Sequence, residues 1–395
     1  MKADIVDVLI VGAGAAGMMC AIEAGRRGRS VRVLDHARAP GEKIRISGGG
    51  RCNFTNLGTG PGNFLGENPR FATSALKRFT QHDFIKRVDR AGIAWHEKTL
   101  GQLFCDDSAK QIIRMLTDDM REAGARLSLG VAVERIARDG DGFEAVLSDG
   151  STVKAGSLVL ATGGKSIPKM GATGWAYDTA RGFGLRVTET RPALVPLTFE
   201  TGVLERLKPL AGVSVEAVVS HGKTRFAEGL LFTHRGLSGP SVLQISSYWR
   251  EGEAISVAMA PGLDVFARLK TMKAENGRQA AHTALGQIVP KRLAELLVEQ
   301  EGGVGNLADL SDKALRRLDA AVNGWSVKPV GSEGYRTAEV TLGGVATDQL
   351  DQQTLAAKSM PGLYVIGEAV DVTGWLGGYN FQWAWSSGWA AGQVC

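Results

Sequence analysis

Short apolar runs and helical segments alternate at the start of the chain. Ile5–Val11 is short and largely apolar, as expected for a central strand of a parallel sheet. Met18–Arg27 predicts a helix that ends at Gly28, and Val31–Leu34 predicts a second strand. The order of strand, helix and strand predicts a Rossmann-type α/β unit.

The mixed pattern continues as far as about residue 187. Apolar residues at helical spacings predict a helix within residues 71–92, and Glu97–Asp107 has the pattern of a short hairpin. Ser108 is placed to cap a helix that runs to about Ala123. Further strands are expected at residues 127–136, 143–147, 152–155 and 158–160.

A different pattern occupies the middle of the chain. The helical period is lost from Thr188 to about Val257, where alternating segments predict an antiparallel β domain. Residues 263–324 are polar and helical, with Pro290 at a predicted helix start. We interpret this segment as a small helical insertion.

Strand character returns after the helical insertion. Residues 338–342 and 362–368 each predict a strand, and an apolar, Trp-rich stretch to Val394 predicts a closing helix. Of Trp383, Trp385 and Trp389, at least two are expected to be core residues.

Composition restricts the class of protein. A chain of 395 residues is too long for one ordinary core, and 44% hydrophobic with 22% charged residues is typical of globular proteins. The four cysteines have no metal-ligand spacing, so we expect neither disulfides nor zinc. The apolar run near the N-terminus lacks the layout of a signal peptide or a membrane span. We therefore expect a cytoplasmic protein.

Positive charge is concentrated near the N-terminus. The net charge is +5, and residues 1–90 hold 15 Lys and Arg against 8 Asp and Glu. This excess indicates either a cofactor phosphate site with a solvated surface or an anionic substrate such as nucleic acid. The first interpretation is favoured, because no run of Lys and Arg with interleaved aromatic residues is present.

A dinucleotide-binding motif follows the first predicted strand. In the GxGxxG pattern, Gly12 permits a tight turn, Gly14 lets the backbone approach a pyrophosphate, and Gly17 lets helix and strand pack closely. Asp35, at the end of the second strand, is placed to accept hydrogen bonds from a ribose and disfavours a 2′-phosphate. Ala15 and Ala16 complete the expected phosphate-binding turn.

The segment Lys43–Asn53 is a second candidate phosphate cradle. Three consecutive glycines expose backbone amides, and cations flank them. A thiol and an amide lie beside the glycines. The candidate binding residues here are Lys43, Ser47, Gly48, Gly49, Gly50, Arg51, Cys52 and Asn53.

The far end of the chain supplies further glycine-rich turns. A Rossmann-type sheet completed from the far end of the chain is the arrangement by which a larger dinucleotide is held at both ends, and FAD fits it. The ADP half would lie on the N-terminal unit and the isoalloxazine against the closing helix, whose dipole favours an anionic reduced flavin. The candidate contacts are Ala161, Thr162, Gly163, Gly164, Gly367, Glu368, Gly377, Gly378, Tyr379 and Asn380.

These motifs resemble the BaiN/YhiN-like family of FAD-dependent oxidoreductases over nearly the whole chain. The resemblance rests on the GxGxxG unit and on the segments 43–56, 231–240, 340–345 and 377–388. Two segments depart from the family pattern: Gly174-Trp175-Ala176, where many members have Gly-Asp-Gly, and 104–107, where members have a proline. Both indicate a distinct subgroup, so the substrate is not carried over.

The resemblance implies a glutathione-reductase-like FAD-binding domain interrupted by a β-barrel domain with a helical insertion. The implied domains are residues 1–187 and 344–395 for FAD binding, 188–262 and 325–343 for the β-barrel, and 263–324 for the helical insert. The resemblance also places Val133 where such folds contact adenine through the backbone.

The leading functional hypothesis is an oxidoreductase in which NAD(P)H reduces FAD and a hydride passes to an unsaturated C=C acceptor. Family resemblance links such reduction to bile-acid intermediates and to uridine in ribosomal RNA. No second GxGxxG follows a strand, so NAD(P)H is expected to bind only transiently. Cys52 and His234 are the candidate proton donors, and each has the alternative of a purely structural role.

Three other functions stay open from the sequence. An amine or amino-acid oxidase that uses dioxygen fits the same FAD site. A flavin-dependent RNA-modifying enzyme fits the basic N-terminal region. A non-enzymatic flavin-binding scaffold is the remaining alternative. No metal site and no membrane partner are expected, and the sequence leaves the oligomeric state open.

Overall fold

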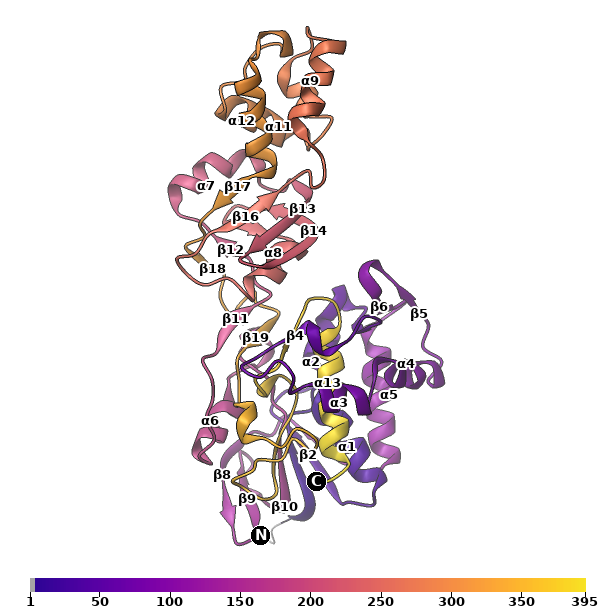
Figure 1. Cartoon of the computed structure of the whole chain (residues 1–395). Helices are drawn as coiled ribbons and strands as arrows, with labels where there is room; N and C mark the ends of the chain where they lie inside the picture. Colours follow the sequence, from indigo (N-terminus) through magenta and orange to yellow (C-terminus); the bar gives the residue numbers. More distant parts are fainter. Residues whose placement is uncertain (1–3) are drawn as a thin grey trace. The chain divides into compact units, whose positions relative to one another are not determined.

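The computed structural model describes residues 4–395 and divides into two compact units (Figure 1). Unit 1 comprises the described residues up to Arg191 together with Val340–Cys395. Unit 2 comprises Pro192–Glu339. Unit 1 is therefore built from two separate stretches of chain, whereas unit 2 is continuous.

A parallel sheet forms the centre of unit 1. β1 (Asp4–Val11) lies between β2 (Val31–Asp35) and β10 (Thr152–Leu160), and β7 (Arg126–Leu129) continues the sheet beyond β2; all these pairs are parallel. Val8, Leu9 and Ile10 are fully buried. Burial on both faces explains why β1 is an apolar run and not an alternating one.

β10 changes its neighbour along its length. Its first residues pair antiparallel with β9 (Gly142–Leu147), which pairs in turn with β8 (Val133–Asp139). Its last residues, Leu158–Leu160, pair in parallel with β20 (Leu363–Val365). The sheet is thus completed by a strand that follows unit 2 in the chain, as the sequence predicts.

Three helices cover this sheet: α1 (Ala15–Arg26), α5 (Ala109–Glu122) and α13 (Tyr379–Gly392). A Cβ at Gly388 of α13 would collide with the Ala16 carbonyl of α1, so the two helices approach closely because that position is glycine. Trp383 and Trp385 are buried in this core, as expected for two of the three tryptophans.

Several expected elements are divided or joined in the structure. The helix expected within residues 71–92 is two helices, α3 (Thr73–Arg78) and α4 (Gln81–Arg90), because Thr80 caps a new helix start. The strand expected at 127–136 is β7 and β8, separated at Gly130, whose φ is +69°. The strands expected at 152–155 and 158–160 are the single strand β10.

The remaining elements of unit 1 are short, and β11 crosses the boundary to unit 2. β3, β6 and β5 form a small antiparallel sheet. The bounds are α2 (Glu42–Ile46), η1 (Ser47–Gly50), β3 (Asn53–Asn56), η2 (Pro61–Asn63), β4 (Phe64–Leu65), β5 (Trp95–Glu97), η3 (Thr99–Gly101), β6 (Gln102–Cys105), η4 (Pro168–Met170), α6 (Trp175–Gly182), β11 (Arg191–Ala193), β19 (Val340–Leu342), η7 (Thr347–Gln349), η8 (Gly367–Ala369) and β21 (Thr373–Gly374).

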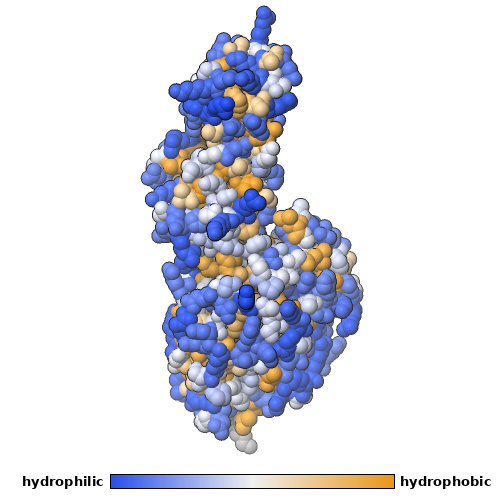
Figure 2. Space-filling model, in the orientation of Figure 1, coloured by the Kyte–Doolittle hydropathy of each residue, from blue (hydrophilic) through white to orange (hydrophobic). Residues whose placement is uncertain are grey.

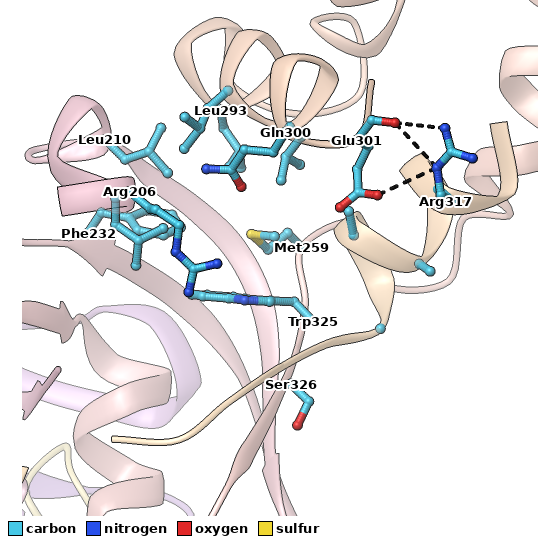
Figure 3. A pocket seen from close by; sticks show the side chains of 16 residues that line it. Arg206, Leu210, Phe232, Met259, Leu293, Gln300, Glu301, Arg317, Trp325 and Ser326 are labelled. Carbon is cyan, nitrogen blue, oxygen red and sulfur yellow. Dashed lines mark hydrogen bonds and ion pairs between the residues drawn. The ribbon is translucent and has the colours of Figure 1, made fainter. Parts of the chain in front are cut away.

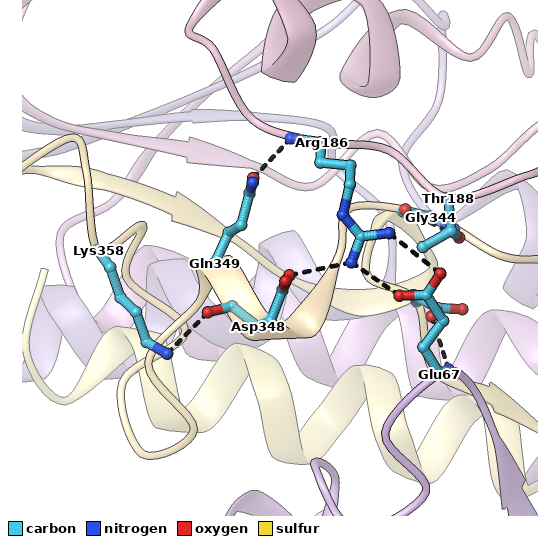
Figure 4. A network of polar contacts seen from close by, with 8 residues as sticks. Glu67, Arg186, Thr188, Gly344, Asp348, Gln349 and Lys358 are labelled. Atoms are coloured by element: carbon cyan, nitrogen blue, oxygen red, sulfur yellow. Dashed lines mark hydrogen bonds and ion pairs between the residues drawn. The ribbon is translucent and has the colours of Figure 1, made fainter.

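A network centred on Arg186 connects the early and late parts of unit 1 (Figure 4). Its guanidinium donates to both carboxylate oxygens of Glu67, at 3.0 and 2.7 Å, and to Asp348 at 3.2 Å. Its backbone N–H donates to the Gln349 side chain. Because the network is exposed, we expect it to align these two parts of the chain and to contribute little to the free energy of unfolding.

Unit 2 holds an antiparallel sheet of seven strands in the order β17-β16-β13-β14-β15-β12-β18. No pairing within residues 4–395 joins its two end strands, so the expected β-barrel is observed as a sheet with two edges. The strands are β12 (Leu197–Thr198), β13 (Ser214–His221), β14 (Thr224–Phe232), β15 (Gly236–Ser238), β16 (Ile255–Ala258), β17 (Trp325–Val327) and β18 (Gly331–Ser332).

Helices occupy most of residues 265–323, between β16 and β17, as the sequence predicts for the helical insertion. Helices also lie at residues 201–210 and 240–246, where the sequence predicted only strands. Pro290 is the N-cap of α11 (Lys291–Gln300). A cavity of about 360 Å³ lies among α11, α12 and the sheet, lined by Phe232, Met259 and Trp325 among others (Figure 3). The other helices are α7 (Thr201–Leu207), η5 (Lys208–Leu210), α8 (Pro240–Ser246), α9 (Val265–Glu275), α10 (Ala281–Leu285), η6 (Leu307–Asp309) and α12 (Asp312–Asn323).

The surface visible in Figure 2 is mostly hydrophilic, with small hydrophobic areas scattered over each unit. No helix among residues 4–395 is long and apolar enough to cross a membrane.

Candidate active site

The turn between β1 and α1 has the geometry that its glycines predict. Gly12 has a φ of +113°, and a Cβ there would collide with the Ala161 backbone. A Cβ at Gly17 would collide with the Gly12 carbonyl, so helix and strand pack closely only with glycine at that position. A Cβ at Gly14 would meet nothing within 4 Å. The open space lies at the N-terminus of α1, where backbone amides and the helix dipole favour an anion.

Asp35 holds the loops around this turn. Its Oδ2 accepts from the Ala13 N–H at 2.7 Å, and its Oδ1 accepts from the Ala37 N–H at 2.9 Å. A carboxylate has about four acceptor positions, so two are left for the ribose hydroxyls expected there. The backbone carbonyl of Asp35 accepts a hydrogen bond from the Val131 N–H at 3.0 Å.

The three glycines of η1 form an exposed run of left-handed backbone. Gly48, Gly49 and Gly50 have φ values of 56°, 66° and 85°. A Cβ at Gly48 would collide with the Phe104 ring, whereas the space at Gly49 is open. Successive backbone amides in such a turn form a concave anion-binding surface. The geometry therefore suits the predicted phosphate cradle.

Cys52 lies directly behind this cradle, out of contact with solvent. Its side chain is fully buried, and its backbone N–H donates to the Ser47 carbonyl at 3.0 Å. Burial raises the pKa of the Cys52 thiol, and the hydrogen bond from Ser47 only partly opposes that rise. The neighbouring Arg51 is exposed. The neutral thiol is thus the stable form.

An ion pair connects the N-terminal cradle to the C-terminal part of unit 1. The Lys43 ammonium donates to Glu368 Oε2 at 2.7 Å and to Ser166 Oγ at 2.6 Å. Glu368 Oε1 accepts from Ser166 Oγ at 3.0 Å and from the Thr341 N–H at 2.9 Å. Ser166 and Thr341 were not predicted from the sequence, because no local spacing relates them to Lys43 or Glu368.

The two glycine-rich segments also meet at the start of α13. Gly377 and Gly378 have φ values of 110° and 96°. Asn56 Nδ2 donates to the Gly377 carbonyl at 2.9 Å. In the amide orientation that satisfies its hydrogen bonds, Asn53 Oδ1 accepts from the Gly378 N–H at 3.3 Å. Residues from the two ends of unit 1 therefore form one continuous site.

Asn380 shapes the last turn of this site. Its Nδ2 donates to the Gly374 carbonyl at 2.9 Å, and its Oδ1 accepts from the Gly374 N–H at 2.8 Å. The neighbouring Tyr379 is mostly buried, with its ring edge-on to Phe64 at 6.4 Å between centroids. These contacts fix the backbone at the N-terminus of α13, where the helix dipole is positive.

One buried polar atom indicates that the site accommodates a polar group. Thr162 Oγ1, in the turn after β10, is buried and has no hydrogen-bond partner among residues 4–395. Buried hydroxyls normally have a partner. Gly163 and Gly164 follow it, and a Cβ at Gly164 would collide with Thr341 and Glu368. Together with the open space at Gly14 and Gly49, this orphaned hydroxyl fits an elongated ligand with phosphates in the middle, such as FAD.

The two remaining predicted residues, Val133 and His234, lie in unit 1 and unit 2 respectively. Val133 begins β8 and pairs with Leu147 at the irregular end of that ladder. His234 belongs to unit 2, in the exposed turn between β14 and β15, and its ring has no hydrogen-bond partner among the described residues. Both assignments stay predictions.

Comparison with known proteins identifies the family. The model of the HI0933-like protein Rossmann domain matches residues 6–394. The chain belongs to this family. Membership confirms the predicted family and the predicted class, an FAD-dependent oxidoreductase with a Rossmann-type domain.

Similar proteins from several bacteria cover nearly the whole chain. The "Ribosomal RNA dihydrouridine synthase" of Escherichia coli (strain K12) is 51% identical over 98% of this chain and 97% of its own length. The "3-dehydro-bile acid delta(4,6)-reductase" of Clostridium scindens is 30% identical over 98% of both chains. Among solved structures, a quinol-fumarate reductase matches 99% of this chain and 71% of its own, with 16% identity and a TM-score of 0.51. At that identity, this HI0933-like protein shares only the fold with the reductase.

Proposed function

We propose that the protein reduces the C5=C6 double bond of a uridine in ribosomal RNA to give dihydrouridine. The observation that carries the proposal is the 51% identity to a ribosomal RNA dihydrouridine synthase over almost the full length of both chains. The bile-acid reductase, at 30% identity, is also named for a reduction. The expectation of C=C reduction and the RNA-modifying alternative therefore combine in one reaction.

The relatives do not favour the oxidase alternative. None of the three relatives that cover nearly the whole chain is named for an amine or amino-acid substrate. An RNA substrate also agrees with the positive charge of residues 1–90, because cations attract its phosphates.

The residues of the candidate active site have distinct roles in this proposal. FAD, when bound, supplies the hydride chemistry. The amides at Gly14 and in Gly48–Gly50 would bind its pyrophosphate, and Asp35 would bind its ribose. Thr162 would donate to, or accept from, a polar atom of the same cofactor.

The C-terminal part of the site would position the ring end of the cofactor. Asn56 and Asn53 fix the Gly377–Gly378 backbone, so that the N-terminus of α13 has one orientation. A fixed helix N-terminus stabilises negative charge near it without reorganisation during the reaction. The Lys43–Glu368 pair would hold the two ends of the site together.

NAD(P)H is proposed as the electron donor. No second GxGxxG follows a strand in the sequence, so the donor would bind transiently at the same site as the substrate. Anaerobic addition of NADH or NADPH should bleach the flavin absorption of the purified protein, and the faster of the two identifies the donor. Absence of bleaching with both would contradict this part of the proposal.

The main experiment measures the product directly. Unmodified ribosomal RNA is incubated with the flavin-loaded protein and the donor, digested to nucleosides and examined by mass spectrometry for dihydrouridine. We expect product formation with ribosomal RNA and none with protein stripped of flavin. If the reduced flavin is reoxidised only by dioxygen and no dihydrouridine forms, the proposal is wrong.

The two predicted proton donors are tested in the same assay. Cys52→Ser and His234→Ala are each compared with wild type for flavin reduction and for dihydrouridine formation. If the substituted residue is the proton donor, its variant should lose product formation while flavin reduction is unchanged. If neither variant changes product formation, both assignments are wrong.

A further inference from the structure

Leu100 combines strain with exposure at the edge of the candidate active site. It lies in η3, between β5 and β6, with φ 57° and ψ 34°. This left-handed conformation is unfavourable for a leucine, because its Cβ lies too close to the following carbonyl oxygen. Its side chain is 64% exposed, so packing does not compensate for the strain. A glycine would adopt the same turn without this cost.

A buried asparagine holds this conformation and connects it to the cofactor end of the site. Asn56, which is 1% exposed, donates from Nδ2 to the Leu100 carbonyl at 3.0 Å and to the Gly377 carbonyl at 2.9 Å. Its Oδ1 accepts from the Gly58 N–H at 2.8 Å. Because two carbonyls share one nitrogen, the backbone of Leu100 lies directly beside the start of α13.

The surroundings of Leu100 suit contact with a nucleic acid. Leu57, 36% exposed, is joined to the same turn by its N–H, which donates to the Gly101 carbonyl at 2.9 Å. Lys98 is exposed and lies 5.4 Å from the centroid of the Phe104 ring. An apolar tip with a cation beside it is the combination that proteins use to separate stacked bases while contacting the phosphates.

We propose that Leu100 enters the base stack of the RNA and fills the space left by the target uridine when that base turns out toward the flavin. This inference rests on the proposed function. A uridine within folded RNA is stacked on its neighbours, and chemistry on its ring requires extrusion, which breaks this stacking. An apolar side chain in the vacated position replaces part of the lost stacking. The strain at Leu100 is kept because it aims the side chain outward beside Gly377.

Leu100→Gly is the decisive variant, because it removes the wedge and relieves the strain together. We expect its melting temperature to equal or exceed that of wild type. Its rate of dihydrouridine formation on folded ribosomal RNA should fall about tenfold or more. A tenfold fall corresponds to a rise of about 1.4 kcal/mol in the activation free energy. On a short unstructured oligonucleotide that contains uridine, its rate should stay within about twofold of wild type.

Two further variants separate the wedge from general surface effects. Leu100→Met keeps an apolar side chain of similar volume and should retain most of the activity on folded RNA. Ile5→Ala changes an apolar residue of unit 1 that is 75% exposed and lies at the opposite end of β1 from Gly12, and it should change neither rate.

A binding measurement tests the wedge without turnover. A fluorescent purine analogue placed next to the target uridine brightens when its neighbour leaves the stack. Wild type should raise this fluorescence, and Leu100→Gly should bind without raising it. Equal fluorescence with both proteins, or an equal loss of rate on folded and unstructured RNA, overturns the proposal. Absence of dihydrouridine with wild type overturns the proposed function instead, while the fluorescence still decides whether Leu100 enters the stack.

Discussion

Gly14 and Gly17 belong to one motif but have opposite surroundings. The space beside Gly14 is open, whereas a Cβ at Gly17 would collide with the Gly12 carbonyl. The motif alone assigns both to the binding turn. In the structure, a ligand could occupy the space beside Gly14, whereas the packing of helix and strand requires glycine at position 17.

This contrast gives a paired prediction. Gly14→Ala should leave the flavin-free protein as stable as wild type, because its φ of −83° suits alanine, yet it should purify with much less FAD. Gly17→Ala should lower the free energy of unfolding by about 1–3 kcal/mol, since the helix must move away from the strand. Thermal unfolding without flavin and the flavin-to-protein absorbance ratio measure the two effects. Loss of stability in Gly14→Ala would contradict the assignment.

The burial of the cysteines predicts slow reaction with alkylating reagents. All four are buried, and burial raises the pKa of Cys105 to about 12 as well as that of Cys52. Thiols in this state react slowly, because the thiolate is the nucleophile. Iodoacetamide at neutral pH should leave Cys52 and Cys105 unlabelled in the native protein and label both in denaturant, as measured by mass spectrometry. Rapid labelling of Cys52 in the native protein would instead restore it as an accessible, reactive group.

Part of the candidate site follows from local sequence patterns and part depends on the fold. The glycine turns and Asp35 were predictable, because their chemistry depends on spacing within about 25 residues of chain. Ser166 and Thr341 were not, because only the fold brings them to Glu368. Asn56 belongs to the segment that carries the family resemblance, yet its bonds to Leu100 and Gly377 have no sequence pattern.

At the scale of elements, helix α4 depends on its first turn. Thr80 Oγ1 accepts from the Asp83 N–H at 3.3 Å, and Asp83 Oδ2 accepts from the Thr80 N–H at 2.9 Å. This reciprocal cap explains why the expected helix over residues 71–92 divides at Thr80. The apolar spacing continues through the break, so periodicity alone predicted one helix.

We expect Thr80→Ala to lower the free energy of unfolding by about 1 kcal/mol through loss of this cap. The measurement is urea denaturation at pH 7. His82→Ala, an exposed change in the same helix, is the control and should alter stability by less than about 0.5 kcal/mol. An equal effect of both changes would mean that the cap does not stabilise α4.

The same cap predicts a pH dependence. Burial raises the pKa of Asp83, but the hydrogen bonds from Thr80 outweigh it, so the pKa lies below the ordinary value. A lowered pKa in the folded state stabilises the fold above the unfolded pKa, and this stability is lost as pH falls through the folded pKa. Asp83→Ala should therefore be less stable than wild type at neutral pH, with a difference that shrinks below about pH 4. Urea denaturation at several pH values measures it, and a constant difference would contradict the assignment.

At the scale of the whole molecule, charge gives one prediction. The net charge is +5, and Lys98 is an exposed cation beside Leu100. If RNA binds there, the logarithm of its binding constant should fall linearly with the logarithm of salt concentration, and Lys98→Ala should reduce the slope by about 0.7. Fluorescence anisotropy over a salt series measures the slope. Lys223→Ala, an exposed lysine of unit 2, serves as the comparison. Binding that does not depend on salt would contradict an RNA substrate.

The division of unit 1 into two stretches of chain has a consequence for biosynthesis. β10 leaves the ribosome before its neighbour β20 exists, and α1 leaves before α13, because all of unit 2 is translated in between. Unit 2 is continuous in sequence, so it can fold as soon as it emerges. Unit 1 cannot complete its fold until β20 and α13 are translated, and until then the apolar surface of β10 and α1 stays exposed. Nascent chains should therefore become resistant to protease first in the inserted unit, although it is encoded second.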